Sequence, residues 1–244
     1  MYKKMIKSGG ILEIYEYEKL NVKGSEIDYE NRAKKGEGEQ ERSLENYRQT
    51  SKKRGETVRR LINANFDCDN SKFLTLTFAE NDKFDITDVK SCNKEYDKFI
   101  KRLKRRYSDV KYVSVIEFQK RGAVHYHMIC NLPFVKKKEL SEIWGLGFVK
   151  INKIDHVDNV GAYVSKYMSK EAADERLRGL KGYNYSKGLE RSIELKTWID
   201  GEKVVDEVCK LYIENKKPVY VAKYTGDEIG QVGYAQYNLN RNHK

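Results

Sequence analysis

Apolar and polar residues alternate along the middle of the chain in two different periods. Residues 73–78, 112–118 and 124–130 carry apolar side chains at every second position or in short β-branched runs, which is typical of strands. Residues 89–107 instead repeat apolar side chains at steps of three and four, which predicts a helix, with Thr87 as its capping residue. The expected order here is strand, helix, strand, strand.

The flanking segments continue this plan. Residues 43–63 have a helical pattern with a basic face, residues 139–144 fit a short helix, residues 148–152 fit a strand, and a further helix follows around residue 160. This order predicts an α+β fold, with a central antiparallel sheet, helices packed on one face and an open face for substrate. The RNA-recognition sheet fold shares this layout.

The ends of the chain carry weaker patterns. Residues 10–17 contain one strand candidate, and the charged, glycine-containing stretch that follows predicts a loop. We therefore expect three segments: an N-terminal strand and charged linker at 1–41, the main domain at 42–178, and a C-terminal extension at 179–244 that packs on the same domain. Within the extension, the pattern fits a helix and then a strand, without a recognisable function.

Residues 117–127 can bring three metal ligands together. If the hairpin loop covers residues 120–122, with Gly122 in the left-handed conformation, Glu117 lies directly opposite His125. His127 lies two residues further along the same strand and shares that face. One carboxylate and two imidazoles suit Mn²⁺ or Mg²⁺ assisted by substrate phosphate, although Zn²⁺ also accepts such ligands. The alternative is that both histidines are exposed sheet residues without a ligand role.

A group of tyrosines and lysines follows about 40 residues later. Tyr163, Lys166, Tyr167 and Lys170 fall within about 60° of one another on a helical wheel, beside an apolar stripe. A tyrosine at such an edge is often a core residue. The accompanying lysines favour chemistry, because burial would make their charges costly. A phenol that attacks phosphorus needs a nearby ammonium to stabilise the developing charge.

These three features, in this order, resemble the motifs of HUH endonucleases that initiate rolling-circle replication. They are the strand at 73–78, the hairpin with Glu117 and His125-Tyr-His127, and the sequence Tyr163-Val-Ser-Lys-Tyr. The stretch from about 42 to 175 looks like the replication-initiator domain of small single-stranded DNA phages and related plasmids. The order of the motifs carries this resemblance.

The resemblance implies roles for individual residues. The two histidines and Glu117 would bind the divalent metal, Tyr163 would become joined to the 5′ phosphate of a nick, and Lys166 would assist at the phosphate. Tyr167 matches the second tyrosine of the isometric-phage initiators, which alternate two nucleophiles. Many plasmid and eukaryotic-virus members lack this second tyrosine.

Composition agrees with a nucleic-acid partner. The 244 residues carry a formal net charge of +11, with a sequence pI near 9.2, which favours binding of a polyanion. Further DNA contacts are expected from Thr75, Thr77, Arg48, Lys52, Arg59 and Lys170. The four cysteines form no C-x-x-C pair, and no window approaches a membrane span. We therefore expect a soluble protein in the cytoplasm of a bacterial host cell.

The predicted activity is that of a replication initiator. It would nick single-stranded origin DNA, form a 5′-phosphotyrosine and a free 3′ hydroxyl, and rejoin strands at termination. No P-loop sequence occurs, so a host helicase would unwind the duplex and a host DNA polymerase would extend the 3′ end. Two alternatives remain open: a plasmid relaxase-type strand transferase, or a non-catalytic nucleic-acid-binding sheet domain whose tyrosines stack on bases.

Overall fold

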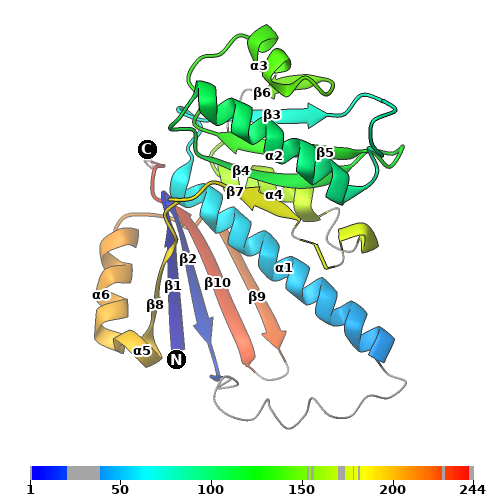
Figure 1. Ribbon diagram of the computed structural model, residues 1–244. Coiled ribbons are helices and arrows are strands. Elements are labelled where there is room, and N and C mark those ends of the chain that lie inside the picture. The colour runs from blue at the N-terminus through cyan, green and yellow to red at the C-terminus, as the bar shows by residue number, and fades with distance from the viewer. Residues whose placement is uncertain are drawn as a thin grey trace. The chain divides into compact units, whose positions relative to one another are not determined.

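Two antiparallel five-stranded sheets organise the described residues of this protein (Figure 1). The structure, a computed structural model, describes residues 2–20, 39–152, 154, 157–169, 174–177, 179–180, 182–226 and 229–241. Residues 45–190 form one compact unit, and residues 1–44 with 191–244 form the other. Each unit contains one of the two sheets.

The unit at 45–190 has the strand order β6-β3-β5-β4-β7. Along the chain its elements are α1 (Glu39–Asn65, which begins in the other unit), β3 (Lys72–Thr77), α2 (Val89–Arg106), β4 (Tyr112–Phe118), β5 (Val124–Cys130), α3 (Lys137–Trp144), β6 (Val149–Asn152), α4 (Val160–Ser169), a 3-10 turn (Glu175–Leu177) and β7 (Tyr183–Tyr185). The expected α+β class is confirmed, and the predicted elements of this unit are all present.

Helices cover both faces of this sheet, so the expectation of helices on one face is wrong. On one side, α2 and α3 bury Tyr96, Phe99 and Trp144 against strand residues such as Leu74. On the other side, Val58 and Ile62 of α1 and Val160 and Val164 of α4 pack on the remaining strand positions, Phe73, Val113, Val115 and Ile129. The strands carry apolar residues on both faces, and both must be removed from water.

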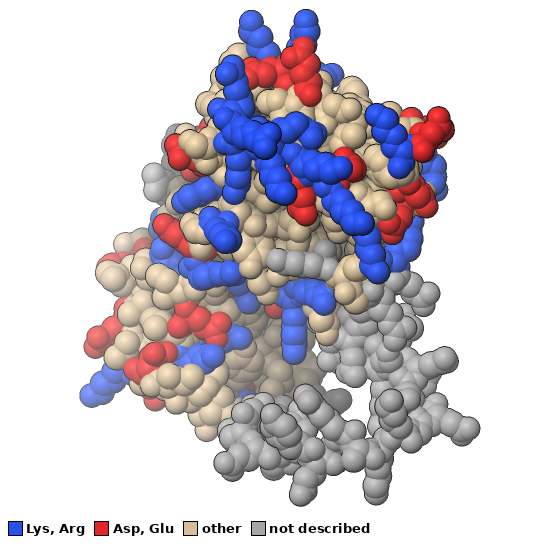
Figure 2. Space-filling view, in the orientation of Figure 1, with Lys and Arg blue, Asp and Glu red and all other residues tan. Residues whose placement is uncertain are grey.

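The outer side of α2 is basic. Lys94, Lys98, Lys101 and Arg105 are exposed on the side opposite the buried stripe. Figure 2 shows lysine and arginine side chains gathered where α2 lies. At its beginning, α2 is capped by Asp88, whose carboxylate accepts from the backbone N–H groups of Lys90 and Ser91. The expected cap, Thr87, instead donates its hydroxyl to Asp85 at 2.7 Å.

The other unit joins the two ends of the chain in one sheet, with the strand order β8-β1-β2-β10-β9. Its elements are β1 (Tyr2–Ser8), β2 (Ile11–Tyr17), β8 (Ile193–Lys196), α5 (Thr197–Asp200), α6 (Glu202–Ile213), β9 (Tyr220–Gly226) and β10 (Gly230–Asn238). One face packs on α6, where Met5, Leu12 and Ile14 contact Val205 and Cys209.

This sheet changes the expected division of the chain. Residues 191–241 do not pack as an extension of the central domain, because β8 pairs with β1 and β10 pairs with β2. Most of the charged linker expected before residue 42 lies outside the described residues, and its end already belongs to α1. None of the described helices is both long enough and apolar enough to cross a membrane.

Candidate active site

The hairpin of β4 and β5 has the register that the sequence predicts. Glu117 lies directly opposite His125 in the ladder. At the turn, the backbone N–H of Gln119 donates to the carbonyl of Ala123 at 2.8 Å, and Gly122 has a φ of 87°, which favours glycine. The ligand atoms of Glu117, His125 and His127 all lie within 4.8 Å of one another. One cation could therefore contact all three residues.

His127 is held in place by two polar neighbours. Its Nε2 lies 2.5 Å from Oε2 of Glu117, and its Nδ1 lies 3.2 Å from the hydroxyl of Thr75 on β3. Only 5% of the residue is exposed. A histidine whose second nitrogen has a fixed partner keeps one ring orientation, which is how metal-binding histidines are usually positioned. Thr75 therefore orients a candidate ligand.

His125 has a different environment. Its Nε2 is buried and has no hydrogen-bond partner among the described residues, which leaves one polar atom facing the cluster unsatisfied. Burial first, and then the neighbouring His127, lower the pKa of His125 to about 4. The ring is therefore neutral at neutral pH, the form that a metal ligand requires. A divalent cation would satisfy this nitrogen, so the three residues fit a metal site.

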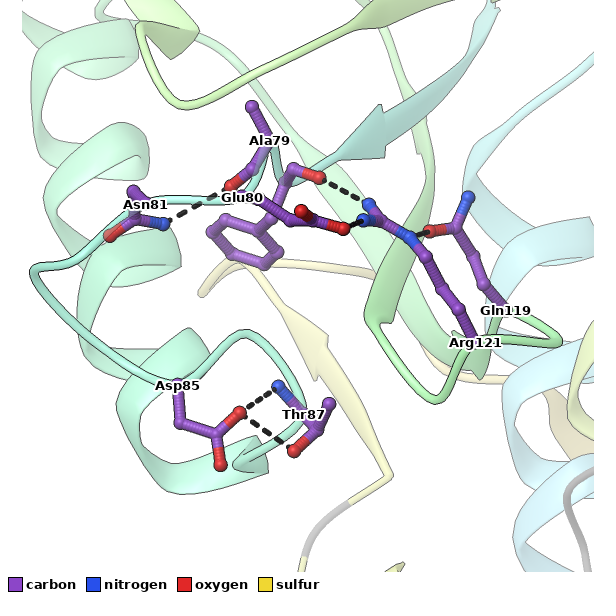
Figure 3. Close-up of polar contacts among 8 residues, drawn as sticks. Ala79, Glu80, Asn81, Asp85, Thr87, Gln119 and Arg121 are labelled. Atoms are coloured by element: carbon purple, nitrogen blue, oxygen red, sulfur yellow. Dashed lines mark hydrogen bonds and ion pairs between the residues drawn. The ribbon is translucent and has the colours of Figure 1, made fainter.

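An arginine ties the hairpin turn to the neighbouring strand. Figure 3 shows Arg121 between Gln119 and Glu80. The guanidinium donates to Glu80 at 2.7 Å, to Gln119 at 2.9 Å and to the carbonyl of Phe78, just beyond β3, at 2.9 Å. These bonds hold the end of the β4–β5 hairpin against the end of β3, and thus fix Glu117 and His125 relative to β3.

The tyrosines of α4 lie on the same sheet face as the ligands. The ring of Tyr167 stacks on the imidazole of His127, with centroids 4.0 Å apart. Tyr163 contacts Phe73 edge to face, with centroids 5.5 Å apart. Lys166 Nζ lies 3.9 Å from the ring centroid of Tyr163 and 5.2 Å from that of Tyr167. The structure thus brings both tyrosines and Lys166 beside the ligand cluster.

The two tyrosines differ in their surroundings. Burial, followed by the hydroxyl of Tyr163 and the charge of Glu117, raises the pKa of Tyr167 to about 12. Its phenol therefore stays protonated at neutral pH, and its ring is occupied by contact with His127. The stacking also means that Tyr167 helps to enclose the ligand cluster.

A close contact between helices sets the position of α4, and sequence reasoning did not find it. The side chain of Asn63 on α1 accepts from the backbone N–H of Gly161 at 2.7 Å. A Cβ atom at residue 161 would lie 2.2 Å from the carbonyl oxygen of Arg59. Only glycine allows this approach. The signal in the sequence was a lone glycine in the first turn of the tyrosine helix.

The other expected DNA contacts are dispersed. Thr77 lies opposite His125 in the ladder, beside the ligand cluster. On α1, Lys52 is exposed, whereas Arg59 is half-buried. The side chain of Arg48, and all of Lys170, lie outside the described residues. Of these residues, the structure brings only Thr75 and Thr77 to the ligand cluster.

Comparisons with known proteins agree with this site. Residues 71–172 match a family model described as a replication-associated protein of the ORF2 type. That segment contains the ligand hairpin and both tyrosines of α4. The phasyl DNA replicon protein arp of Escherichia coli is 26% identical over a match that covers 48% of this chain and 50% of that protein. The chain thus spans about half the length of this relative. A search of solved structures gave no match.

Proposed function

We propose, because residues 71–172 match the replication-associated protein family, that this protein initiates replication by nicking single-stranded DNA at an origin. The observation that carries the proposal is the convergence of Glu117, His125 and His127 beside the tyrosines of α4. A carboxylate, two imidazoles and a phenol are the groups that a metal-assisted strand transfer needs. The nick would leave a 3′ end for a host polymerase after a host helicase opens the duplex.

The metal would be held by Glu117, His125 and His127, with Mn²⁺ or Mg²⁺ as the proposed ion. When bound, it would polarise the scissile phosphate and offset its charge. Thr75 keeps the ring of His127 in position, and Arg121 keeps the hairpin against β3. The protein's own contribution is thus a preorganised set of ligands.

Tyr163 is the proposed first nucleophile. Its oxygen forms a bond to phosphorus as the bond to the 3′ oxygen breaks, which leaves a 5′-phosphotyrosine and, after proton uptake, a 3′ hydroxyl. Lys166 supports this role, because its ammonium lies close to the ring of Tyr163 and can stabilise negative charge there. The reverse reaction would rejoin strands, since the phosphotyrosine conserves the energy of the broken bond.

Tyr167 is the proposed acceptor in a second transfer. Its raised pKa and its stacking on His127 make it the less available phenol before DNA binds. The remaining proposed DNA contacts are Thr75, Thr77, Arg48, Lys52, Arg59 and Lys170. They would guide the strand across the sheet or along α1.

The decisive test is the covalent adduct. The protein is incubated with labelled single-stranded origin DNA and Mn²⁺ and then analysed on a denaturing gel. Wild type and the control Tyr107→Phe, a tyrosine whose hydroxyl bonds Glu139 away from this site, should form a protein-linked band. Tyr163→Phe should abolish that band. Tyr167→Phe should keep the first nick but lose repeated transfer.

Mass spectrometry of the linked peptide assigns the nucleophile. An adduct on Tyr167 alone would reverse the two roles. If origin oligonucleotides give no adduct and DNA binding is unaffected by EDTA, the non-catalytic sheet domain becomes the better description. A relaxase-type activity would instead appear as a preference for a conjugative transfer origin over a replication origin.

A further inference from the structure

The row of side chains that contains the metal ligands continues to the edge of the sheet. Across the strands, Glu117 lies opposite His125, which lies opposite Thr77. The backbone N–H of Thr77 then donates to the carbonyl of Phe148 at 2.9 Å, which places Phe148 next in the row. In the adjacent row, Thr75 lies between His127 and Lys150.

Strand alternation assigns Phe148 and Lys150 to the ligand side of the sheet. Val149, between them, is fully buried in the core beneath α2, so its two neighbours face the other way. Phe148 is nevertheless 55% exposed, and Lys150 is exposed as well. The short side chains of Thr75 and Thr77 are all that separates them from the histidines along these rows.

Cations accompany this exposed ring. Lys137 Nζ, from the first turn of α3, lies 4.5 Å from the ring centroid of Phe148. The neighbouring Lys136 and Lys138 are also exposed. The nearby acidic side chain beyond β3, Glu80, is engaged by Arg121 at 2.7 Å. An exposed aromatic ring with lysines around it matches the chemistry of a single strand, which offers both stacking bases and phosphates.

We propose that Phe148, Lys137 and Lys150 form a nucleotide subsite, in which one base of the single strand beside the nick stacks on Phe148 while its phosphates contact the two lysines. The inference rests on the proposed nicking function and adds a residue that fixes the position of the strand. Two strand spacings, about 10 Å, separate Phe148 from His125, which corresponds to no more than about three stacked nucleotides. The subsite would therefore read a base close to the scissile phosphate.

The first test uses binding without cleavage. Phe148→Trp is titrated with single-stranded DNA in EDTA, and quenching of the new indole fluorescence is the expected result. Phe148→Ala should bind about 5- to 150-fold more weakly, as expected for the loss of one stacked base, and Phe148→Tyr should restore binding. Tyr220→Ala is the matched control, because Tyr220 is 58% exposed but belongs to the other unit.

The second test locates the base. Oligonucleotides carry a single abasic site at successive positions around the nick, and binding and adduct formation are measured for each. Wild type should be sensitive to one position within about three nucleotides of the nick, and Phe148→Ala should lose that sensitivity selectively. Lys137→Gln and Lys150→Gln should reduce the dependence of affinity on salt.

The outcomes separate this inference from the nicking proposal. Normal adduct formation with no effect of Phe148→Ala on binding or on the abasic profile overturns the subsite alone. Quenching of Phe148→Trp and position-specific sensitivity of binding, without any adduct, would support the subsite and refute the nuclease. A change from dimer to monomer in Phe148→Ala, with DNA binding unchanged, would identify the ring as a contact between copies and overturn the proposal.

Discussion

His125 and His127 are two residues apart, yet they depend on a metal to different degrees. His127 already has Glu117 and Thr75 as partners, whereas Nε2 of His125 is buried without one among the described residues. A buried polar atom without a partner lowers stability, and removing it relieves that cost. The two histidines should therefore behave differently when each is replaced in the metal-free protein.

The first prediction concerns metal binding and stability. His125→Ala and His127→Ala should each remove most Mn²⁺ binding in calorimetric titration, and Glu117→Gln should weaken it. In EDTA, His127→Ala should lower the free energy of unfolding by about 1–3 kcal/mol, because Glu117 and Thr75 lose a partner. His125→Ala should cost less. Unchanged Mn²⁺ affinity in both histidine variants would show that the cluster is not a metal site.

The second prediction concerns pH. The pKa of His125 is lowered to about 4 in the folded protein, whereas the unfolded value is near 6.5. The unfolded chain therefore binds more protons between these values, so this residue's contribution to stability is lost as pH falls from about 6.5 to about 4. Urea unfolding in EDTA should show that His125→Gln lacks this contribution. Parallel pH profiles for the two proteins would contradict the assignment.

At the scale of elements, the contact between α1 and α4 positions the tyrosines. Gly161 lies against the backbone of Arg59, and Asn63 accepts from the N–H of Gly161. The sequence could predict α4 and its tyrosine face, because both follow from local periodicity. It could not predict the contact, because residue 161 is nearly 100 positions from Asn63 and nothing local marks glycine as the point of approach.

The third prediction tests this contact. Gly161→Ala should destabilise the protein by about 1–3 kcal/mol and reduce adduct formation more than Mn²⁺ binding, because the new methyl must displace α4 from α1. Gly55→Ala, in the middle of α1, is the matched control: no atom lies within 4 Å of the added Cβ. That change should be neutral or stabilising by up to about 1 kcal/mol. Equal effects of the two substitutions on thermal unfolding would argue against a tight helix contact.

The metal hairpin was predictable in detail for a local reason. Gly122 and the strands on either side of it are consecutive in the chain, so turn geometry alone fixes Glu117 opposite His125. The second helical layer was not foreseen, because it depends on Phe73 and Ile129 facing away from α2 toward residues of α1 and α4. The sheet of the other unit escaped for a similar reason, since Met5 pairs with Leu195.

Charge is unevenly divided over the whole molecule. The unit at 45–190 holds 30 of the 48 lysines and arginines but only 20 of the 37 acidic residues, so +10 of the net +11 belongs to it. The exposed side of α2 contributes to this excess, as Figure 2 shows. Attraction of a phosphate backbone should therefore be a property of the unit that contains the metal ligands.

The fourth prediction follows from this division. The affinity for DNA should fall linearly with salt on logarithmic axes. Replacing Lys94 and Lys101 of α2 with glutamine should flatten that slope by up to about two units, one for each lost phosphate contact. The same change at Lys203 and Lys210, exposed on α6 of the other unit, should leave it unaltered. Fluorescence anisotropy at several salt concentrations measures both, and a slope that responds only to the α6 pair would contradict the division.

The pairing of β1 and β2 with β8 and β10 also bears on how the chain folds during synthesis. The first hairpin leaves the ribosome early, but both of its outer edges stay open until residues 193–196 and 230–238 have been made. Everything between residues 45 and 190 can meanwhile complete its own contacts. A ribosome that stalls before β10 would thus release a folded metal-binding unit joined to exposed strand edges, which are prone to aggregate.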